Sequence, residues 1–141
     1  MKIVDLPLPV DRVVPANSWK PPAGVRIVSS DNHNMEVDHL YEERLPAKWK
    51  DKAPVWYRDR KAESVIFKAE GRDLLPAGTG DKITIGREGQ YDPALQLKDM
   101  DAENIDSTII FHGMFQSLNG LQDKELYWAC VDVYNEWLAE Y

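Results

Sequence analysis

The sequence predicts an α/β domain in which parallel strands are covered by helices. Residues 25–30 begin with a β-branched run that is typical of a buried strand, and residues 105–111 form a second such run. A helical pattern precedes the second strand, and another follows it to the end of the chain. Because strand and helix alternate along the chain, we expect parallel strands with the helices packed outside the sheet.

Length, composition and charge limit the class of protein. A chain of 141 residues with 43% hydrophobic and 29% charged residues can form one domain with a core. A formal net charge of −7 argues against nucleic acid or an anionic membrane as a partner. No apolar run approaches the roughly 18 residues of a membrane span. Pro7 and Pro9 interrupt any signal-peptide core, so we expect a cytoplasmic protein. The single cysteine, Cys130, excludes an internal disulfide and a Cys-rich zinc module.

The N-terminal residues 1–24 are rich in proline. Proline fixes φ and removes a backbone donor, so this arm is expected to be extended and irregular. Two interpretations stay open for it: an arm that lies over the surface of the domain, and a linker. The prolines are Pro7, Pro9, Pro15, Pro21 and Pro22.

A long insert, residues 37–90, is expected between the first strand and the first long helix. Residues 38–45 predict a short helical turn that ends before Pro46. Residues 55–57 and 64–67 predict a hairpin whose strands are separated by a polar stretch, and a glycine-rich loop follows. Inserts of this length usually carry function or cover a site.

Two helices are predicted from their caps and apolar faces. Asp92 and Pro93 are typical of a helix start, and this helix should end near Asn104 with Leu97 and Met100 on its apolar face. Asp123 should cap a long helix that runs to the last residue. The apolar face of that helix is Leu126, Cys130, Val133, Trp137 and Tyr141.

An acidic and an imidazole side chain, Asp31 and His33, stand where the first strand gives way to a loop. Alternation along a strand places them on the same side. Carboxylate oxygen and imidazole nitrogen both bind divalent metals, so the pair is half of a candidate metal site. The alternative is a loop aspartate that caps a turn, beside an exposed histidine.

Two further polar residues are candidates for contact with a substrate. Glu36 could orient a ligand or touch substrate, and the alternative is a solvated loop carboxylate. His112 follows the second strand, so it should face the same end of the sheet as Asp31 and His33. The alternative for His112 is a polar loop histidine.

The segment Ser30–Glu36, with the sequence Ser-Asp-Asn-His-Asn-Met-Glu, resembles the opening metal motif of the amidohydrolase-related family. Aminocarboxymuconate-semialdehyde decarboxylase and γ-resorcylate decarboxylase are members of that family. The resemblance extends over residues 25–141, and two positions depart from it: Val37 stands where relatives usually have proline, and His112 where proline or a small residue is common. The further similar segments, in chain order, are residues 40–46, 92–101, 104–106 and 134–139.

The resemblance implies the N-terminal part of a (β/α)₈ barrel, of which this chain supplies about two βα units. It implies that Asp31 and His33 bind a divalent metal, Zn²⁺ or alternatively Mn²⁺, with further ligands and the general base beyond residue 141. Glu36 and His112 would then contact the substrate.

The expected function is that of a metal-dependent hydrolase or non-oxidative decarboxylase acting on a small carboxylated or cyclic substrate. The 141-residue chain alone is expected to be inactive. The alternative is a non-catalytic subunit, or a truncated relic, that completes a partner's barrel. A homo-oligomer is also compatible with the sequence.

Overall fold

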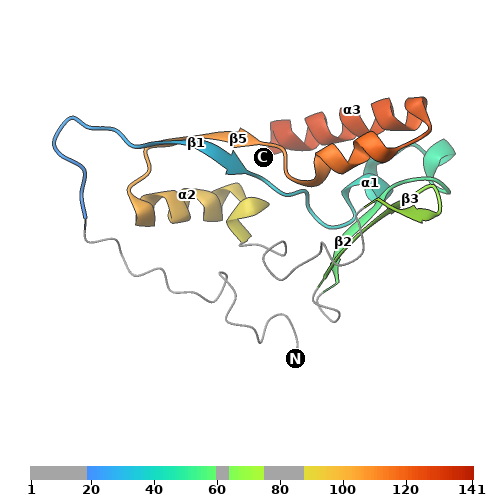
Figure 1. Ribbon diagram of the computed structural model, residues 1–141, viewed down its shortest axis with the longest axis horizontal. Coiled ribbons are helices and arrows are strands. Elements are labelled where there is room, and N and C mark those ends of the chain that lie inside the picture. Colours follow the sequence, from blue (N-terminus) through green and yellow to red (C-terminus); the bar gives the residue numbers. More distant parts are fainter. Residues whose placement is uncertain (1–18, 60–63, 75–87) are drawn as a thin grey trace.

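The computed structural model describes residues 19–59, 64–74 and 88–141, and it shows a mixed α/β fold (Figure 1). The first 18 residues of the predicted arm and residues 75–87 of the glycine-rich stretch lie outside the described residues. No helix within the described ranges combines the length and the apolar character needed to cross a membrane.

The strands are β1 (Val28–His33), β2 (Val55–Asp59), β3 (Ser64–Ala69), β4 (Arg72–Asp73) and β5 (Ser107–Phe111). The α-helices are α1 (Leu40–Arg44), α2 (Pro93–Glu103) and α3 (Lys124–Glu140), and 3-10 turns cover Ala47–Trp49, Glu88–Gln90 and Met114–Gly120.

Strands β1 and β5, which are far apart in the sequence, pair in parallel as predicted. Ser29 pairs with Thr108 and Asn32 with Ile110, so β1 uses one more residue than β5 over this interval. This extra residue is a β-bulge, which re-aims the side chains that follow it. The bulge places Asn32 on the same face as Ser29, while His33 emerges on the other face.

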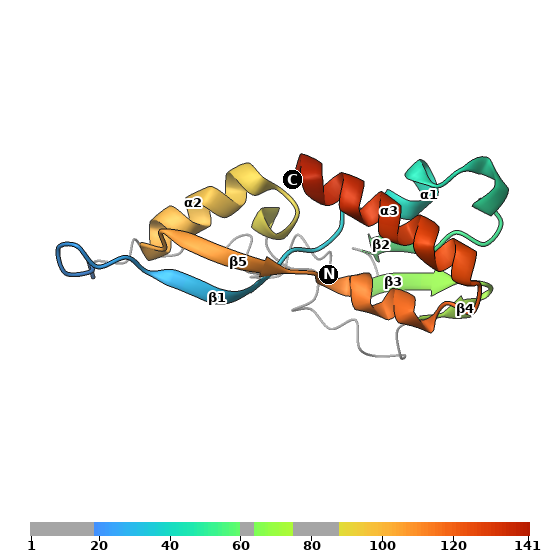
Figure 2. The same ribbon diagram turned by 90° about the horizontal axis from the view of Figure 1, so that it is seen from above.

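The prediction that these two strands are buried is wrong. β1 also begins three residues later than expected, so Asp31 and His33 belong to the strand itself. Helix α2 runs along one side of the pair (Figures 1 and 2), and the side chains facing it are half-buried. The other face carries exposed apolar side chains: Val28 is 56% exposed, Ile109 51% and Phe111 47%. We call the surface formed by Val28, His33, Ile109 and Phe111 the open face.

Helix α2 begins and ends as predicted. The Asp92 carboxylate accepts hydrogen bonds from the backbone N–H groups of Ala94 and Leu95, and Asn104 ends the helix in a left-handed conformation with φ of 58°. The predicted apolar face is wrong, because Leu97 is exposed and no residue of the helix is buried. The strands contribute polar residues, among them Ser29, Asn32 and Thr108, to the cleft between the sheet and α2.

The hydrophobic core lies beyond the end of the parallel pair, among α1, α3 and the β2–β3 hairpin. The hairpin is antiparallel as predicted, with Trp56 opposite Phe67 and their rings packed edge to face at 5.4 Å between centroids. The residues that turn this hairpin, 60–63, lie outside the described residues. The predicted apolar face of α3 is confirmed, with Tyr141 half-buried and the other four side chains buried. The insert therefore supplies a large part of the core.

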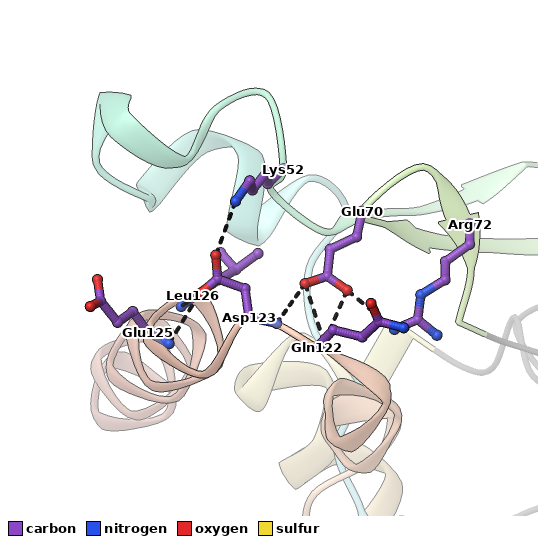
Figure 3. A network of polar contacts seen from close by, with 7 residues as sticks. All are labelled: Lys52, Glu70, Arg72, Gln122, Asp123, Glu125 and Leu126. Atoms are coloured by element: carbon purple, nitrogen blue, oxygen red, sulfur yellow. Dashed lines mark hydrogen bonds and ion pairs between the residues drawn. The ribbon is translucent and has the colours of Figure 1, made fainter.

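A polar network joins the tip of the β3–β4 hairpin to the start of α3 (Figure 3). The Glu70 carboxylate accepts hydrogen bonds from the backbone N–H groups of Gln122, at 3.0 and 3.2 Å, and Asp123, at 2.8 Å. Arg72 pairs with Glu70 at 3.1 Å. Asp123 caps α3, as predicted, and also pairs with Lys52 at 3.1 Å. The network fixes the N-terminus of α3 against the hairpin.

Candidate metal centre

The structure brings Asp31 and His33 together at the C-terminal end of β1. His33 Nε2 lies 3.3 Å from Asp31 Oδ1, and the two side chains are 54% and 78% exposed, respectively. Two ligands of a tetrahedral zinc ion, with bonds of about 2.0–2.2 Å, stand about 3.3–3.6 Å apart. The donor atoms of this pair are therefore spaced as two ligands of one ion would be.

The imidazole of His33 is held by the backbone of the neighbouring strand. Its Nδ1 lies 2.8 Å from the carbonyl oxygen of His112. A carbonyl oxygen only accepts, so Nδ1 carries the proton, and in the neutral ring Nε2 keeps a lone pair. This lone pair and the Asp31 carboxylate are both acceptors, and they come together only with a cation or a second ring proton between them.

The C-terminal ends of the two strands approach each other closely just beyond this pair. The backbone N–H of Asn34 donates to the carbonyl oxygen of Phe111 at 3.2 Å. A Cβ atom on Gly113 would lie 2.2 Å from the carbonyl oxygen of Asn34, so the chain passes here only with glycine. Sequence reasoning missed both Asn34 and Gly113. The signal available was a glycine two residues after the end of the second strand.

Glu36 lies in the core. It is fully buried, and the hydroxyl of Tyr41 donates to its Oε1 at 3.1 Å. Burial, followed by the charge of Glu36, raises the pKa of Tyr41 well above its ordinary value, so this hydroxyl stays a donor. The interpretation of Glu36 as a solvated carboxylate is wrong. The predicted roles of Glu36, orienting a ligand or touching substrate, stay predictions.

From the side of β2, Arg58 holds the loop that follows β1. The prediction assigned it to the polar stretch between the hairpin strands, but β2 continues to Asp59. Both terminal nitrogens of its buried guanidinium donate to the carbonyl oxygen of Glu36 at 3.1 Å, and one also pairs with Asp38. The guanidinium lies over the ring of Tyr91 at 4.4 Å. A planar, forked cation is suited to such a combination of contacts.

His112 contributes to the site through its backbone. Its ring is exposed and packs against Phe115, with 5.6 Å between centroids. Its carbonyl oxygen is the group that contacts His33. The sequence singled out His112 for its side chain. A hydrogen bond to its backbone carbonyl could not be predicted, because every residue has such a carbonyl.

Asp31 and His33 offer a metal ion only a small number of protein ligands. Within the described residues, no group of three or more His, Cys, Asp or Glu side chains is placed to hold a metal ion. The pair therefore supplies two donors, whereas a zinc site usually has three or four protein ligands.

A polar cleft of about 260 Å³ opens between α2 and the parallel strands, and His33 is among the residues that line it. Its walls include the carboxylates of Asp99 and Glu103 from α2, and the side chains of Ser29 and Asn32 from β1. Two carboxylates in one wall disfavour an anionic ligand in this cleft.

Comparison with known proteins adds no assignment: the chain matches no protein-family model, and no curated protein is significantly similar to it. The resemblance of residues 30–36 to a metal motif therefore stays a prediction.

Proposed function

We propose that this chain is the N-terminal part of a metal-dependent hydrolase or non-oxidative decarboxylase of the amidohydrolase-related type. Asp31 and His33 bind a divalent cation, Zn²⁺ or alternatively Mn²⁺. The observation that supports this most directly is the 3.3 Å approach of two acceptor atoms, one of them on a histidine whose other nitrogen donates to a backbone carbonyl. Metal-binding histidines typically donate their second N–H in this way.

The competing interpretation is a surface ion pair between a doubly protonated His33 and Asp31. Both side chains are more than half exposed, so such a pair contributes little to stability. Such an ion pair does not require the close placement of Asp31 and His33 that accompanies the β-bulge and the Gly113 contact. A metal site requires this placement, because bond lengths and donor spacing must be met closely.

A bound divalent ion lowers the pKa of a coordinated water, or polarises a carbonyl or carboxylate oxygen of the substrate. In this proposal Asp31 supplies a hard, anionic oxygen, which suits Mn²⁺ as well as Zn²⁺. A small carboxylated or cyclic substrate approaches from the open face, because the cleft under α2 is lined by carboxylates. Of the two residues predicted to contact substrate, His112 is exposed at the end of β5, whereas Glu36 is fully buried.

The proposal includes the fold: β1 and β5 would be two strands of a (β/α)₈ barrel. Parallel sheets are found buried on both faces, yet the described part of this sheet has two strands and an exposed apolar face. Further βα units, from a continuation of the chain or from a partner, would cover Val28, Ile109 and Phe111 and supply the remaining ligands and the general base.

A second candidate is a non-catalytic subunit, or a truncated relic, that completes a partner's barrel. The small ligand set favours it, since two donors hold a metal weakly. The two candidates differ in what accompanies the chain. A co-purifying protein that supplies further βα units and forms a competent site without Asp31 and His33 would indicate the subunit.

Metal binding by the purified chain tests the site. We expect one Zn²⁺ per chain by isothermal titration calorimetry at neutral pH, with weak affinity, and loss of this binding in Asp31→Asn and His33→Ala. His39→Ala is the matched control, because His39 is an exposed histidine paired with Glu42 at 3.0 Å. Equal Zn²⁺ affinity in His33→Ala and the unmodified chain would overturn the assignment. In the complete enzyme, both site variants should abolish metal-dependent turnover.

A further inference from the structure

We propose that Gly113 is a positioning residue for His33. By allowing the ends of β1 and β5 to close together, it holds the His112 carbonyl against Nδ1 and so leaves Nε2 as the metal-binding nitrogen. This inference rests on the proposed function of Asp31 and His33 as metal ligands.

The contact at Gly113 is made with backbone, which has little freedom to move. A Cβ atom built there would lie 2.2 Å from the Asn34 carbonyl oxygen, 3.3 Å from its carbonyl carbon and 3.4 Å from Met35 Cγ. Relief of the first contact requires the two chain segments to separate by about 1 Å, since non-bonded heavy atoms settle near 3.5 Å.

Separation of the strand ends acts directly on His33. Two hydrogen bonds connect the strands at this point: Asn34 N–H to the Phe111 carbonyl at 3.2 Å, and His33 Nδ1–H to the His112 carbonyl at 2.8 Å. His112 immediately precedes Gly113, so a shift of Gly113 carries the His112 carbonyl with it. A His33 ring without this acceptor is free to place its proton on Nε2, where it blocks metal binding.

Asn34 is anchored from the other side, so it does not move away to relieve the contact. Its side chain is fully buried, and its Oδ1 accepts a hydrogen bond of 3.1 Å from the hydroxyl of Tyr134 on α3. Burial, followed by the charge of Glu36, raises the pKa of Tyr134 to about 12, so the hydroxyl remains a donor at neutral pH. A chain of contacts thus runs from α3 through Asn34 and Gly113 to His33.

The test compares Gly113→Ala with Gly120→Ala. A Cβ atom on Gly120 would meet only the flexible Leu74 Cδ2 at 3.4 Å, an ordinary contact, so this variant controls for loss of glycine. The readouts are the ring ¹⁵N shifts of His33 in long-range ¹H–¹⁵N spectra, taken where the ring is neutral, and the Zn²⁺ affinity by calorimetry. The ¹⁵N shifts report the tautomer, which a purely structural role of Gly113 would leave unchanged.

We expect the Nδ1–H tautomer in the unmodified chain and in Gly120→Ala. In Gly113→Ala we expect a mixture of tautomers and a 10–100-fold loss of Zn²⁺ affinity, the usual cost of losing a group that orients a metal ligand. A folded Gly113→Ala with unchanged tautomer and affinity would overturn the inference.

If Gly113→Ala fails to fold, the variant Tyr134→Phe tests the same inference with the same two readouts. It loosens Asn34 without adding an atom, and we expect the same direction of change in tautomer and affinity at smaller amplitude. Unchanged values in that variant would overturn the inference. The proposed function fails separately: an unmodified chain that keeps the Nδ1–H tautomer but binds no Zn²⁺ rejects the metal site and leaves the positioning role of Gly113 in place.

Discussion

The hydroxyl of Tyr134 donates a 3.1 Å hydrogen bond to the side-chain oxygen of Asn34, 100 residues earlier in the chain. Both residues are buried. The bond ties the longest helix to the loop that follows the candidate metal ligands. The core around α3 is therefore hydrogen-bonded to the residue that directly follows His33, at the same end of β1 at which the exposed pair stands.

Loss of this bond should be costly for stability. We predict that Tyr134→Phe lowers the free energy of unfolding by about 1–3 kcal/mol, because it leaves a buried amide oxygen without its donor. Asn34 Nδ2 is already buried without a hydrogen-bond partner among the described residues. Urea denaturation measures the effect. The double variant Tyr134→Phe/Asn34→Leu should recover part of the loss, since it removes both polar groups. A cost below about 0.5 kcal/mol for the single variant would contradict the role of the bond.

The aromatic packing of α3 gives a second prediction. Trp137 is buried and packs against Tyr134 and Tyr141, with 5.6 and 5.7 Å between ring centroids. Trp137→Ala should lower the free energy of unfolding by about 3–5 kcal/mol through the cavity that it leaves. Trp128 on the same helix is 62% exposed, and Trp128→Ala should change it by no more than about 0.5 kcal/mol. Similar melting temperatures for the two variants would be incompatible with this packing.

The network in Figure 3 predicts sensitivity to acid. Burial opposes ionisation of Glu70, but hydrogen bonds from the Gln122 and Asp123 N–H groups and from Arg72 outweigh it and hold the pKa of Glu70 below its ordinary 4.5. A lowered pKa in the folded state means that this stabilisation is complete above pH 4.5 and is lost as the pH falls through the folded-state value.

We therefore expect the urea midpoint to fall as the pH drops below 4.5, with a smaller fall in Glu70→Gln. Part of the dependence should persist, because the bond to Lys52 lowers the pKa of Asp123 and the bond to Arg44 lowers the pKa of Glu140. Glu136→Gln, on the exposed side of α3, controls for the loss of one charge. An identical pH dependence in Glu70→Gln and the unmodified chain would rule out a contribution from Glu70.

The open face gives a fourth prediction. Ile109→Thr keeps a β-branched residue in β5 but makes an exposed position polar, so the free energy of unfolding should change by no more than about 0.5 kcal/mol. Light scattering should show less self-association, because an exposed apolar patch favours it. Val65→Thr in β3 is the buried comparison and should cost about 1–3 kcal/mol. An equal cost in both strands would mean that another surface covers Ile109 in solution.

Elements defined by local chemistry were predictable. The caps Asp92 and Asp123 and the apolar face of α3 follow from residue type and spacing, because a helix depends on contacts within a few residues. The parallel pairing of β1 with β5 follows from the alternation of strand and helix. The exposure of β1, β5 and Leu97 was not predictable. An apolar residue type favours burial, but it does not determine whether another element packs against that residue.

The same division applies to the site. The sequence alone determined that Asp31 and His33 stand two residues apart near the end of a strand, and that His112 follows the other strand. Only the tertiary structure decided that their donor atoms lie 3.3 Å apart and that a backbone carbonyl fixes the ring of His33. The physical reason is that the ring of His33 takes its orientation from the carbonyl of His112, 79 residues later in the chain, and this contact depends on how closely the ends of β1 and β5 approach. Spacing along one segment does not encode an approach between two segments.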